Sequence, residues 1–310
     1  MATALAFLLG YAVNQASTCA VTAAKLLLHD GQTGLTFGFG LAVGIAGTLT
    51  MPLAWLLDSA AHLAPWLGIS AGLLIGAVLL GLGAVINDAC LFGTLNRIGN
   101  GELRFALLPA GLGLGFMLAA RVPELSASAA MPNPLAQPSL VGAAALLGFV
   151  LLAAAAWRVL ARQGQARFHP AAWPLRYAMA LFGLAGALLY AFVPGWTYAD
   201  AVRRAVSSAP QMMASAAAAL CAAATVSGTV VSGLRSNRFK PQRPTLTGAV
   251  RSLLGGIVMA VGATLIPGGN DSLLFAALPA LSPGGVTAYA VMTGTVLALV
   301  ASLRRFRQAP

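Results

Sequence analysis

The sequence predicts an all-α integral membrane protein, and three observations support this fold class. Hydrophobic residues make up 59% of the 310 residues and charged residues only 8%, and the mean hydropathy is +0.84. A soluble domain carries about 25% charged residues, so this chain lacks the polar surface that a water-soluble globule needs. The apolar residues also form long runs of about 20, which is the length of a helix that crosses a bilayer.

The expected spans follow one another along the whole chain. The first, at about 2–28, is interrupted by a polar segment at 14–18 and resumes at Cys19. Uninterrupted apolar segments follow at about 33–57, 66–87, 103–122, 139–160, 176–195, 210–233, 248–267 and 284–303. We therefore expect about nine transmembrane helices. The segments 88–99 and 268–283 are too short to cross and too apolar for loops, so we expect short re-entrant helices there.

The positions of the basic residues predict the orientation. If Arg304 and Arg305 near the C-terminus lie in the cytoplasm, nine crossings place 15 of the 18 Lys and Arg residues on the cytoplasmic side. Only Arg121, Arg203 and Arg204 then lie outside, as the positive-inside rule requires. We expect a bacterial inner (plasma) membrane protein with its N-terminus outside and its C-terminus in the cytoplasm. The net charge of +11 is thus a topology signal, and we expect no nucleic-acid partner.

A weak internal repeat divides the chain. Segments 81–95 and 261–275 each end a glycine-rich span with small polar residues and then begin a short apolar helix. The expected topology places these breaks on opposite sides of the membrane, which indicates two inverted halves within one membrane domain of residues 1–310. We assign a first pseudo-repeat to 1–122, connecting spans to 123–209 and a second pseudo-repeat to 210–310.

Interrupted spans of this kind point to the binding site of a transporter. Irregular backbone at membrane depth must be buried in protein or line a wet path, because lipid does not satisfy its polar groups. Short helices that begin at such breaks also direct their positive N-terminal ends inward. This arrangement suits an anion.

Three segments carry the residues of a known signature. Gly255 to Asn270 is similar to the pattern Gly-Gly-x-x-Met-x-x-Gly-Ala-x-x-x-x-Gly-Gly-Cys of the YeeE/YedE family. Ala89 to Gly101 resembles the first-half counterpart of that pattern, with a Gly-Thr-Leu-x-Arg-x-Gly-x-Gly tail. The segment around Cys19 resembles the N-terminal cysteine segment of the family.

The resemblance implies an hourglass of two inverted halves with short helices meeting at the waist, and uptake of a sulphur-containing anion such as thiosulfate. Members of the family place three cysteines along the path. Two of these positions match Cys19 and Cys90, whereas Asn270 occupies the third. An amide is a stronger hydrogen-bond donor than a thiol, so the solute can differ from thiosulfate. The resemblance also implies a small cytoplasmic sulphur-carrier protein as a partner, beside the anionic solute and the lipid bilayer.

Asp88, Gly269 and Asp271 flank the two breaks, and the sequence leaves two roles open for them. Intramembrane carboxylates mark ion paths and proton relays. Asp is also a favoured N-cap residue, so each acid is equally a candidate cap of the short helix beside it. Cys221 lies in an Ala-rich span and matches no family position. We expect it to be a buried small hydrophobe.

The sequence leaves three functions in play. The first is a permease that imports a small sulphur-containing anion through a cysteine-lined path. The alternatives are a related permease for a different small solute, and a membrane sulphur-transfer protein that uses Cys90. No His is placed to act as a general base for such covalent chemistry. The chain contains no Walker motif, no CxxC pair and no ligand-spaced His. We therefore expect no enzymatic activity, no cofactor and no metal.

Overall fold

The computed structural model describes residues 1–57, 63–121, 130–163, 171–193, 195–206, 212–266 and 268–308. Within these ranges, eight helical segments are long and apolar enough to cross a membrane. A shorter apolar helical segment covers Leu103–Ala119. The all-α membrane fold is therefore confirmed, and the eight long segments together with the shorter one correspond to the nine expected crossings.

The structure divides the expected spans into the following elements. The α-helices are α1 (Ala2–Gln15), α2 (Ala20–Asp30), α3 (Gly34–Leu57), α4 (Ala71–Asn87), α5 (Leu91–Gly99), α6 (Leu108–Ala119), α7 (Leu140–Arg162), α8 (Leu175–Phe192), α9 (Tyr198–Val206), α10 (Met212–Arg235), α11 (Leu246–Leu265), α12 (Asn270–Ser272) and α13 (Pro283–Gln308). The remaining elements are the 3-10 helices η1 (Leu103–Leu107) and η3 (Pro134–Ala136), the π-helix η4 (Leu273–Ala277), and the strands β1 (Trp66–Leu67) and β2 (Ala130–Met131).

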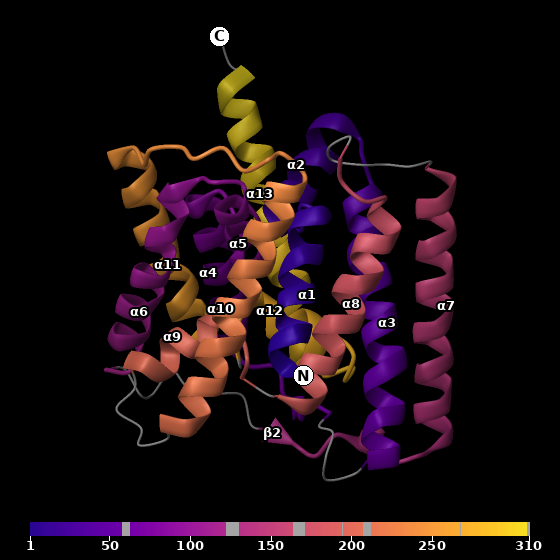
Figure 1. Cartoon of the computed structure of the whole chain (residues 1–310). Helices are drawn as coiled ribbons and strands as arrows, with labels where there is room; N and C mark the ends of the chain where they lie inside the picture. Colours follow the sequence, from indigo (N-terminus) through magenta and orange to yellow (C-terminus); the bar gives the residue numbers. More distant parts are fainter. Residues whose placement is uncertain are drawn as a thin grey trace.

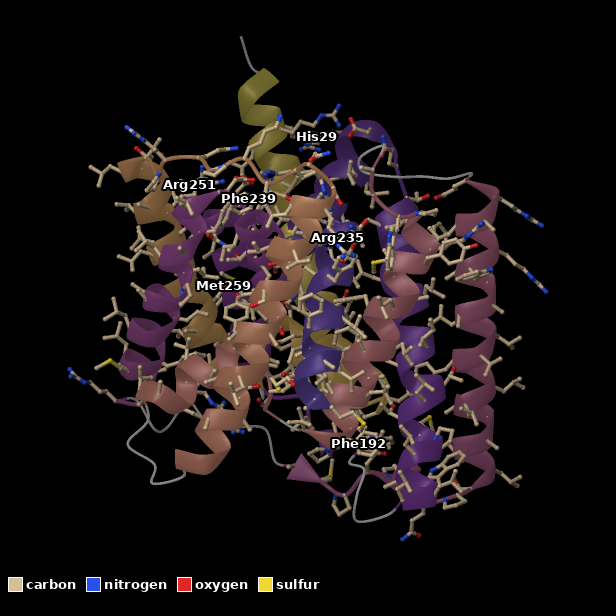
Figure 2. The ribbon with its side chains drawn as sticks, viewed as in Figure 1. His29, Phe192, Arg235, Phe239, Arg251 and Met259 are labelled. Carbon is tan, nitrogen blue, oxygen red and sulfur yellow. The ribbon has the colours of Figure 1, made fainter. Side chains whose placement is uncertain are left out.

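The long helices stand side by side, with α7 at one edge and α6 and α11 at the other (Figure 1). The end of α13 projects from one face of the bundle, which we call the C-terminal face. The strand β2 and helix α9 lie toward the opposite face. Arg235 and Arg251 lie in the half of the molecule next to the C-terminal face, whereas Phe192 lies near the opposite face (Figure 2).

Glycines bring α4 and α11 into close antiparallel contact. Gly76, near the start of α4, packs against Leu265 at the end of α11. Gly255, in the first half of α11, packs against Asn87 at the end of α4. A Cβ atom added at Gly255 would lie 2.7 Å from the Cβ of Asn87, so any side chain there would force the helices apart. Such close approach is how small residues pack membrane helices.

Two further helices pack in parallel with this central pair. The packed pairs are Gly111–Leu253 and Gly115–Ile257 between α6 and α11, and Leu73–Gly284 and Gly81–Met292 between α4 and α13. The helix α6, which follows the break at Asp88, therefore lies beside α11. The helix α13, which follows the break at Gly268, lies beside α4 in the corresponding way.

Some boundaries differ from those that the apolar runs predict. The span expected at 66–87 opens instead as β1, which pairs antiparallel with β2. Helix α4 begins only after Ser70, whose hydroxyl oxygen accepts the N–H of Leu73 at 3.1 Å. The span expected at 103–122 opens as the 3-10 helix η1. The expected span ends at 122, 210–211 and 267 lie outside the described residues.

Candidate functional site

The first break in the helices positions Cys19. Helix α1 ends at Gln15, the chain turns through Ser17 in the left-handed region (φ 50°), and α2 begins at Ala20. Cys19 is the N-cap residue of α2 and is only 2% exposed. Its thiol therefore lies inside the protein, at the N-terminal end of α2. The first backbone N–H groups of a helix have no partner within the helix.

The second break positions Cys90 at the start of α5. Asp88, in the left-handed region (φ 66°), closes α4 as its C-cap residue, and Cys90 is the N-cap residue of α5. The buried side chain of Asn87 holds this turn, because its Nδ2 donates to the carbonyl of Ala89 at 2.8 Å and to Thr94 Oγ1 at 2.9 Å. Cys90 is 3% exposed, so α5 also begins inside the protein.

The structure brings Cys19 and Cys90 together. The backbone N–H of Ala20 donates to Cys90 Sγ at 3.4 Å, and the thiols of Cys19 and Cys90 lie close enough to interact. Gly93 makes room for this pair. A Cβ atom at that position would lie 2.8 Å from the Cβ of Cys19 and would also collide with its sulphur. Both cysteines thus sit where the starts of α2 and α5 meet.

The third break positions Asn270 and Asp271. Gly268 has a φ of 96°, and Gly269 is the N-cap residue of α12. Neither acid that flanks a break is an N-cap residue, since Asp88 ends α4 and Asp271 lies inside the first turn of α12. Asn270 is 5% exposed and Asp271 is 2% exposed. One side-chain oxygen of each, Oδ1, is buried without a hydrogen-bond partner among the described residues.

The start of α12 meets the start of α5. A Cβ atom added at Gly269 would lie 2.5 Å from Leu91 Cδ1, so the backbone of the third break touches the first residue of α5. The C-terminal ends of the two short helical segments point apart. Asn100, just after α5, accepts the N–H of Lys240 at 2.9 Å. Ala280, just after η4, accepts Trp66 Nε1–H at 2.9 Å near the opposite face.

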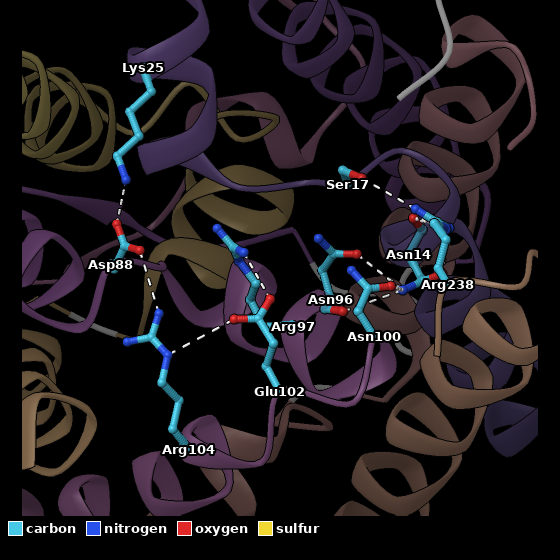
Figure 3. A network of polar contacts seen from close by, with 10 residues as sticks. All are labelled: Asn14, Ser17, Lys25, Asp88, Asn96, Arg97, Asn100, Glu102, Arg104 and Arg238. Atoms are coloured by element: carbon cyan, nitrogen blue, oxygen red, sulfur yellow. Dashed lines mark hydrogen bonds and ion pairs between the residues drawn. The ribbon is translucent and has the colours of Figure 1, made fainter. Parts of the chain in front are cut away.

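An ionic network is centred on Asp88 at the end of α4 (Figure 3). Asp88 is ion-paired with Lys25 of α2, and its second oxygen lies 3.5 Å from Arg104 Nη2. Glu102 pairs with Arg97 at 2.8 Å and approaches Arg104 at 3.9 Å. Asp88 therefore connects the end of α4 to α2 and η1, and its charge is compensated by two cations.

A second polar network joins the end of α1 to α5 and to the segment after α10 (Figure 3). Arg238 donates to the carbonyl of Asn14 at 2.7 Å and to Ser17 Oγ at 3.4 Å. The Nδ2 of Asn14 donates to Asn96 Oδ1 at 3.1 Å and to Asn100 Oδ1 at 3.0 Å. Burial lowers the pKa of the Arg238 guanidinium below its usual value. The turn that leads to Cys19 is thus held by several hydrogen bonds.

A cavity of about 540 Å³ borders the break at Gly268. Its lining includes exposed Pro65 and Arg203, so it opens at the opposite face. Its remaining polar side chains are Thr50, Tyr190, Asp200, Arg204 and Ser272. The hydroxyls of Tyr190 and Ser272 are hydrogen-bonded at 2.8 Å, and Gly268 and Ser272 bring the third break to its wall.

Sequence reasoning missed most of this cavity because it missed α9. The signal is present as Thr197-x-x-Asp200, the spacing of a capping box at a helix start. The backbone N–H of Asp200 donates to Thr197 Oγ1 at 3.1 Å, and Thr197 Oγ1 donates to Asp200 Oδ2 at 2.9 Å. Helix α9 then presents Asp200, Arg203 and Arg204 to the cavity.

An aromatic cluster separates the cavity from the cysteines. Phe275 of η4 lines the cavity and packs edge-on against Phe182 of α8, with ring centroids 4.8 Å apart. Phe92, in the first turn of α5, packs against Phe182 at 4.9 Å and against Phe275 at 5.9 Å. These side chains are at most 2% exposed, so they form a dry partition beside the start of α5.

Cys221 does not belong to this arrangement. It lies in α10, is buried, and takes part in none of the contacts described at the three breaks. The sequence prediction of a packing role therefore stays a prediction. Among the described residues, no group of three His, Cys, Asp or Glu side chains has an arrangement that suits a metal ion.

Comparison with known proteins identifies the family. No curated protein shows significant similarity to the chain. A family model described as sulphur transport matches residues 15–298, which include all three breaks and the cavity-lining helix α9. The match covers most of the 310 residues, and the chain therefore belongs to the YeeE/YedE family of sulphur-transport proteins.

Proposed function

We propose that this transporter imports a small sulphur-containing anion, with thiosulfate as the leading solute, along a path through Cys19, Cys90 and Asn270. The observation that carries the proposal is the meeting of the two cysteines at the starts of α2 and α5, joined by the Ala20 N–H to Cys90 Sγ contact. The start of α12, with Asn270, touches the same place through Leu91.

The charge distribution of this meeting point favours an anion. Helices α2 and α5 both begin there, and their unpaired N–H groups and dipoles place partial positive charge at their starts. Thiols and the Asn270 amide add hydrogen-bond donors that suit a desolvated anion. On the cavity side, Arg203 and Arg204 attract an anion from solution before it meets the aromatic partition.

We propose that the path lies between two inverted halves, a first pseudo-repeat within 1–122 and a second within 210–310, joined by residues 123–209. The antiparallel pair α4 and α11 supports this arrangement, because each helix ends in a break and each break is followed by a short helical segment. The helix that comes next in each half packs in parallel with the central helix of the other half: α6 packs against α11, and α13 packs against α4. In this arrangement the short segments are re-entrant helices. The two inverted halves meet along the antiparallel pair α4 and α11.

We also propose that the C-terminal face is cytoplasmic in a bacterial inner membrane, so that the cavity faces outward. Its exposed cations, among them Arg235, Lys240 and Arg243, suit an acidic surface on a small sulphur-carrier protein. Reporter fusions test the orientation, with a periplasmic reporter expected to be active at the N-terminus and a cytoplasmic one at the C-terminus. Co-purification of the chain with a candidate carrier tests the partner.

Growth on defined sulphur sources tests the solute. The chain is expressed in a strain that lacks its own uptake of thiosulfate and sulfate, and growth is measured on each anion as the sole sulphur source. We expect growth on thiosulfate for the wild-type chain and none for Cys90→Ala. Growth on sulfite or a selenium oxyanion with none on thiosulfate would support the related permease for a different solute, with Asn270 as the reason. Absence of growth on every anion would contradict the proposal.

A further inference from the structure

The two carboxylates at the breaks have opposite electrostatic surroundings. The side chain of Asp88 is 25% exposed and is paired with Lys25 and Arg104. Asp271 is 2% exposed, and it forms no ion pair with any described residue. Its Oδ1 is buried and lacks a hydrogen-bond partner in the same part of the chain. Asp88 is thus paired with two cations, whereas Asp271 has no cationic partner in the part of the chain that the structure describes.

Two oxygen-bearing side chains, Asp200 and Thr197, lie between Asp271 and the cavity. Asp200 lines the cavity and accepts the hydroxyl of Thr197 at 2.9 Å. The Thr197 hydroxyl, 3% exposed, also lies close enough to Asp271 to interact with its carboxylate. These three polar side chains form a short route along which a proton can move from the cavity through Asp200 and Thr197 to Asp271.

Among the described residues, the other groups near Asp271 form no ion pair with it. Asp200 of α9 adds a second negative charge, and the phenols of Tyr190 (α8) and Tyr198 (α9) face the carboxylate from the neighbouring helices. Cys90 of α5 lies beyond Tyr198, whose hydroxyl donates to the carbonyl of Leu91 at 3.2 Å. Arg203 and Arg204 line the wall of the cavity.

This environment shifts Asp271 toward its neutral form. Burial of a charge without an ion pair is costly, and a like charge nearby adds to the cost. An ionised Asp271 would also repel an anion at Asn270, the residue before it. A protonated Asp271 instead offers an O–H donor to that anion. Proton and anion therefore favour each other's binding, which is a reciprocal linkage between two sites.

We propose that Asp271 carries a proton inward with the anion, so that the protein is a proton–anion symporter. The proposal rests on the proposed function, because it assigns the energy coupling of the same path. The proton comes from the outer solution, passes through Asp200 and Thr197 to Asp271, and is released to the inner solution after the anion has passed. No bond other than the O–H bonds forms or breaks.

Purified full-length protein in proteoliposomes tests the proposal, with radiolabelled thiosulfate as the solute and a pH-sensitive dye inside. Three measurements are made: thiosulfate exchange without a pH gradient, acidification of the lumen when thiosulfate is added outside, and accumulation under an imposed gradient. For the wild type we expect exchange and acidification. One pH unit, acid outside, should raise accumulation about tenfold for each coupled proton.

The variants separate coupling from binding. Asp271→Asn keeps the size and hydrogen-bonding capacity of the side chain, so we expect exchange to persist while acidification and the response to the gradient are lost. Asp200→Asn should slow acidification without changing the accumulation ratio. Asp88→Asn is the matched control, since it removes the compensated carboxylate, and it should behave like the wild type in acidification and gradient response.

The proposal is overturned if wild-type exchange occurs without acidification, if a sodium gradient replaces the proton gradient as the driving force, or if Asp271→Asn acidifies the lumen as the wild type does. If Asp271→Asn loses exchange as well, the carboxylate-retaining variant Asp271→Glu is measured. Exchange with acidification in Asp271→Glu supports the proposal, and exchange without acidification overturns it. Failure of the proposed function looks different, because the wild type then exchanges neither thiosulfate nor sulfite, sulfate or a selenium oxyanion.

Discussion

The backbone N–H of Ala20 donates to the sulphur of Cys90, which lies 70 positions further along the chain. This contact links the break between α1 and α2 to the break between α4 and α5. The position of each thiol therefore depends on two helix starts. It also depends on Gly93, which has no side chain and leaves room for Cys19. Substitutions that move one helix start should impair transport before they impair folding.

Replacement of Gly93 by Ala tests this dependence. The added Cβ would lie 2.8 Å from the Cβ of Cys19 and 3.2 Å from that of Ala89, so the Cys19 thiol has to move. We expect transport to fall by about tenfold or more, the effect of a barrier raised by about 1.4 kcal/mol. The measurement is initial uptake of labelled anion at equal amounts of protein in the membrane.

The matched control is Gly294→Ala in α13, where a Cβ would meet nothing within 4 Å. This variant should transport like the wild type and keep its melting temperature in detergent. Equal transport by Gly93→Ala and Gly294→Ala would show that the position of the Cys19 thiol is unimportant.

Replacement of Asn270 by Cys restores the cysteine that the family pattern carries at this position. Asn270 has a buried Oδ1 without a partner among the described residues, so a smaller side chain should relieve an unsatisfied acceptor. We expect Asn270→Cys to fold stably and to shift selectivity toward thiosulfate over sulfate and sulfite. Competition of unlabelled anions against labelled thiosulfate measures this shift. If competition is the same in the variant and the wild type, Asn270 does not contact the solute on its path.

Neutralisation of Arg203 tests the cavity as the place where the anion is first attracted. We expect Arg203→Gln to raise KM about fivefold, the effect of losing roughly 1 kcal/mol of attraction, with little change in kcat. The effect should shrink at high ionic strength, because salt screens exposed charges. Arg121→Gln is the control, since Arg121 is exposed at the end of α6 and does not line the cavity. An equal KM increase in both variants would point to a general surface-charge effect.

The backbone of Asp88 predicts an unusual order of tolerated substitutions. Its φ of 66° suits Gly, Asn and Asp, whereas a left-handed Ala costs roughly 1 kcal/mol or more. Its partner Lys25 has a side chain that is 42% exposed, so loss of that pair should cost only about 0.2–1 kcal/mol. We therefore expect Asp88→Asn to be more stable than Asp88→Ala in thermal unfolding. Both variants lose the ion pairs, so the reverse order would mean that the left-handed backbone at this position does not set the difference between them.

Much of the fold was predictable because lipid imposes simple rules on the chain. The length of the apolar runs gave the nine crossings, and the Gly-rich ends of two of them marked the breaks at Asp88 and Gly268. Because unsatisfied backbone is expelled from lipid, these breaks had to be buried in protein. The structure adds that Cys19 and Cys90 are N-cap residues and neighbours, a relation between segments 70 residues apart that no local pattern contains.

The rest depended on tertiary contacts or on signals too short to stand out. Helix α9 has nine residues, too few to register as a span, and its capping residue Thr197 is one of many. The different electrostatic surroundings of Asp88 and Asp271 follow from the side chains that pack beside them. Lys25 and Arg104 reach the first carboxylate, whereas the second has no ion pair with a described residue and has the negative charge of Asp200 nearby. Spacing along the chain does not encode that difference.

Uptake of labelled thiosulfate by proteoliposomes containing the wild type, Cys90→Ala or Cys221→Ala tests the proposed path most directly. All three cysteines are buried and free, so Cys221→Ala controls for the loss of a buried thiol as such. We predict saturable uptake by the wild type and by Cys221→Ala, with a loss of tenfold or more in Cys90→Ala at an unchanged melting temperature. Equal uptake by Cys90→Ala and the wild type would contradict a path through the meeting point of α2, α5 and α12.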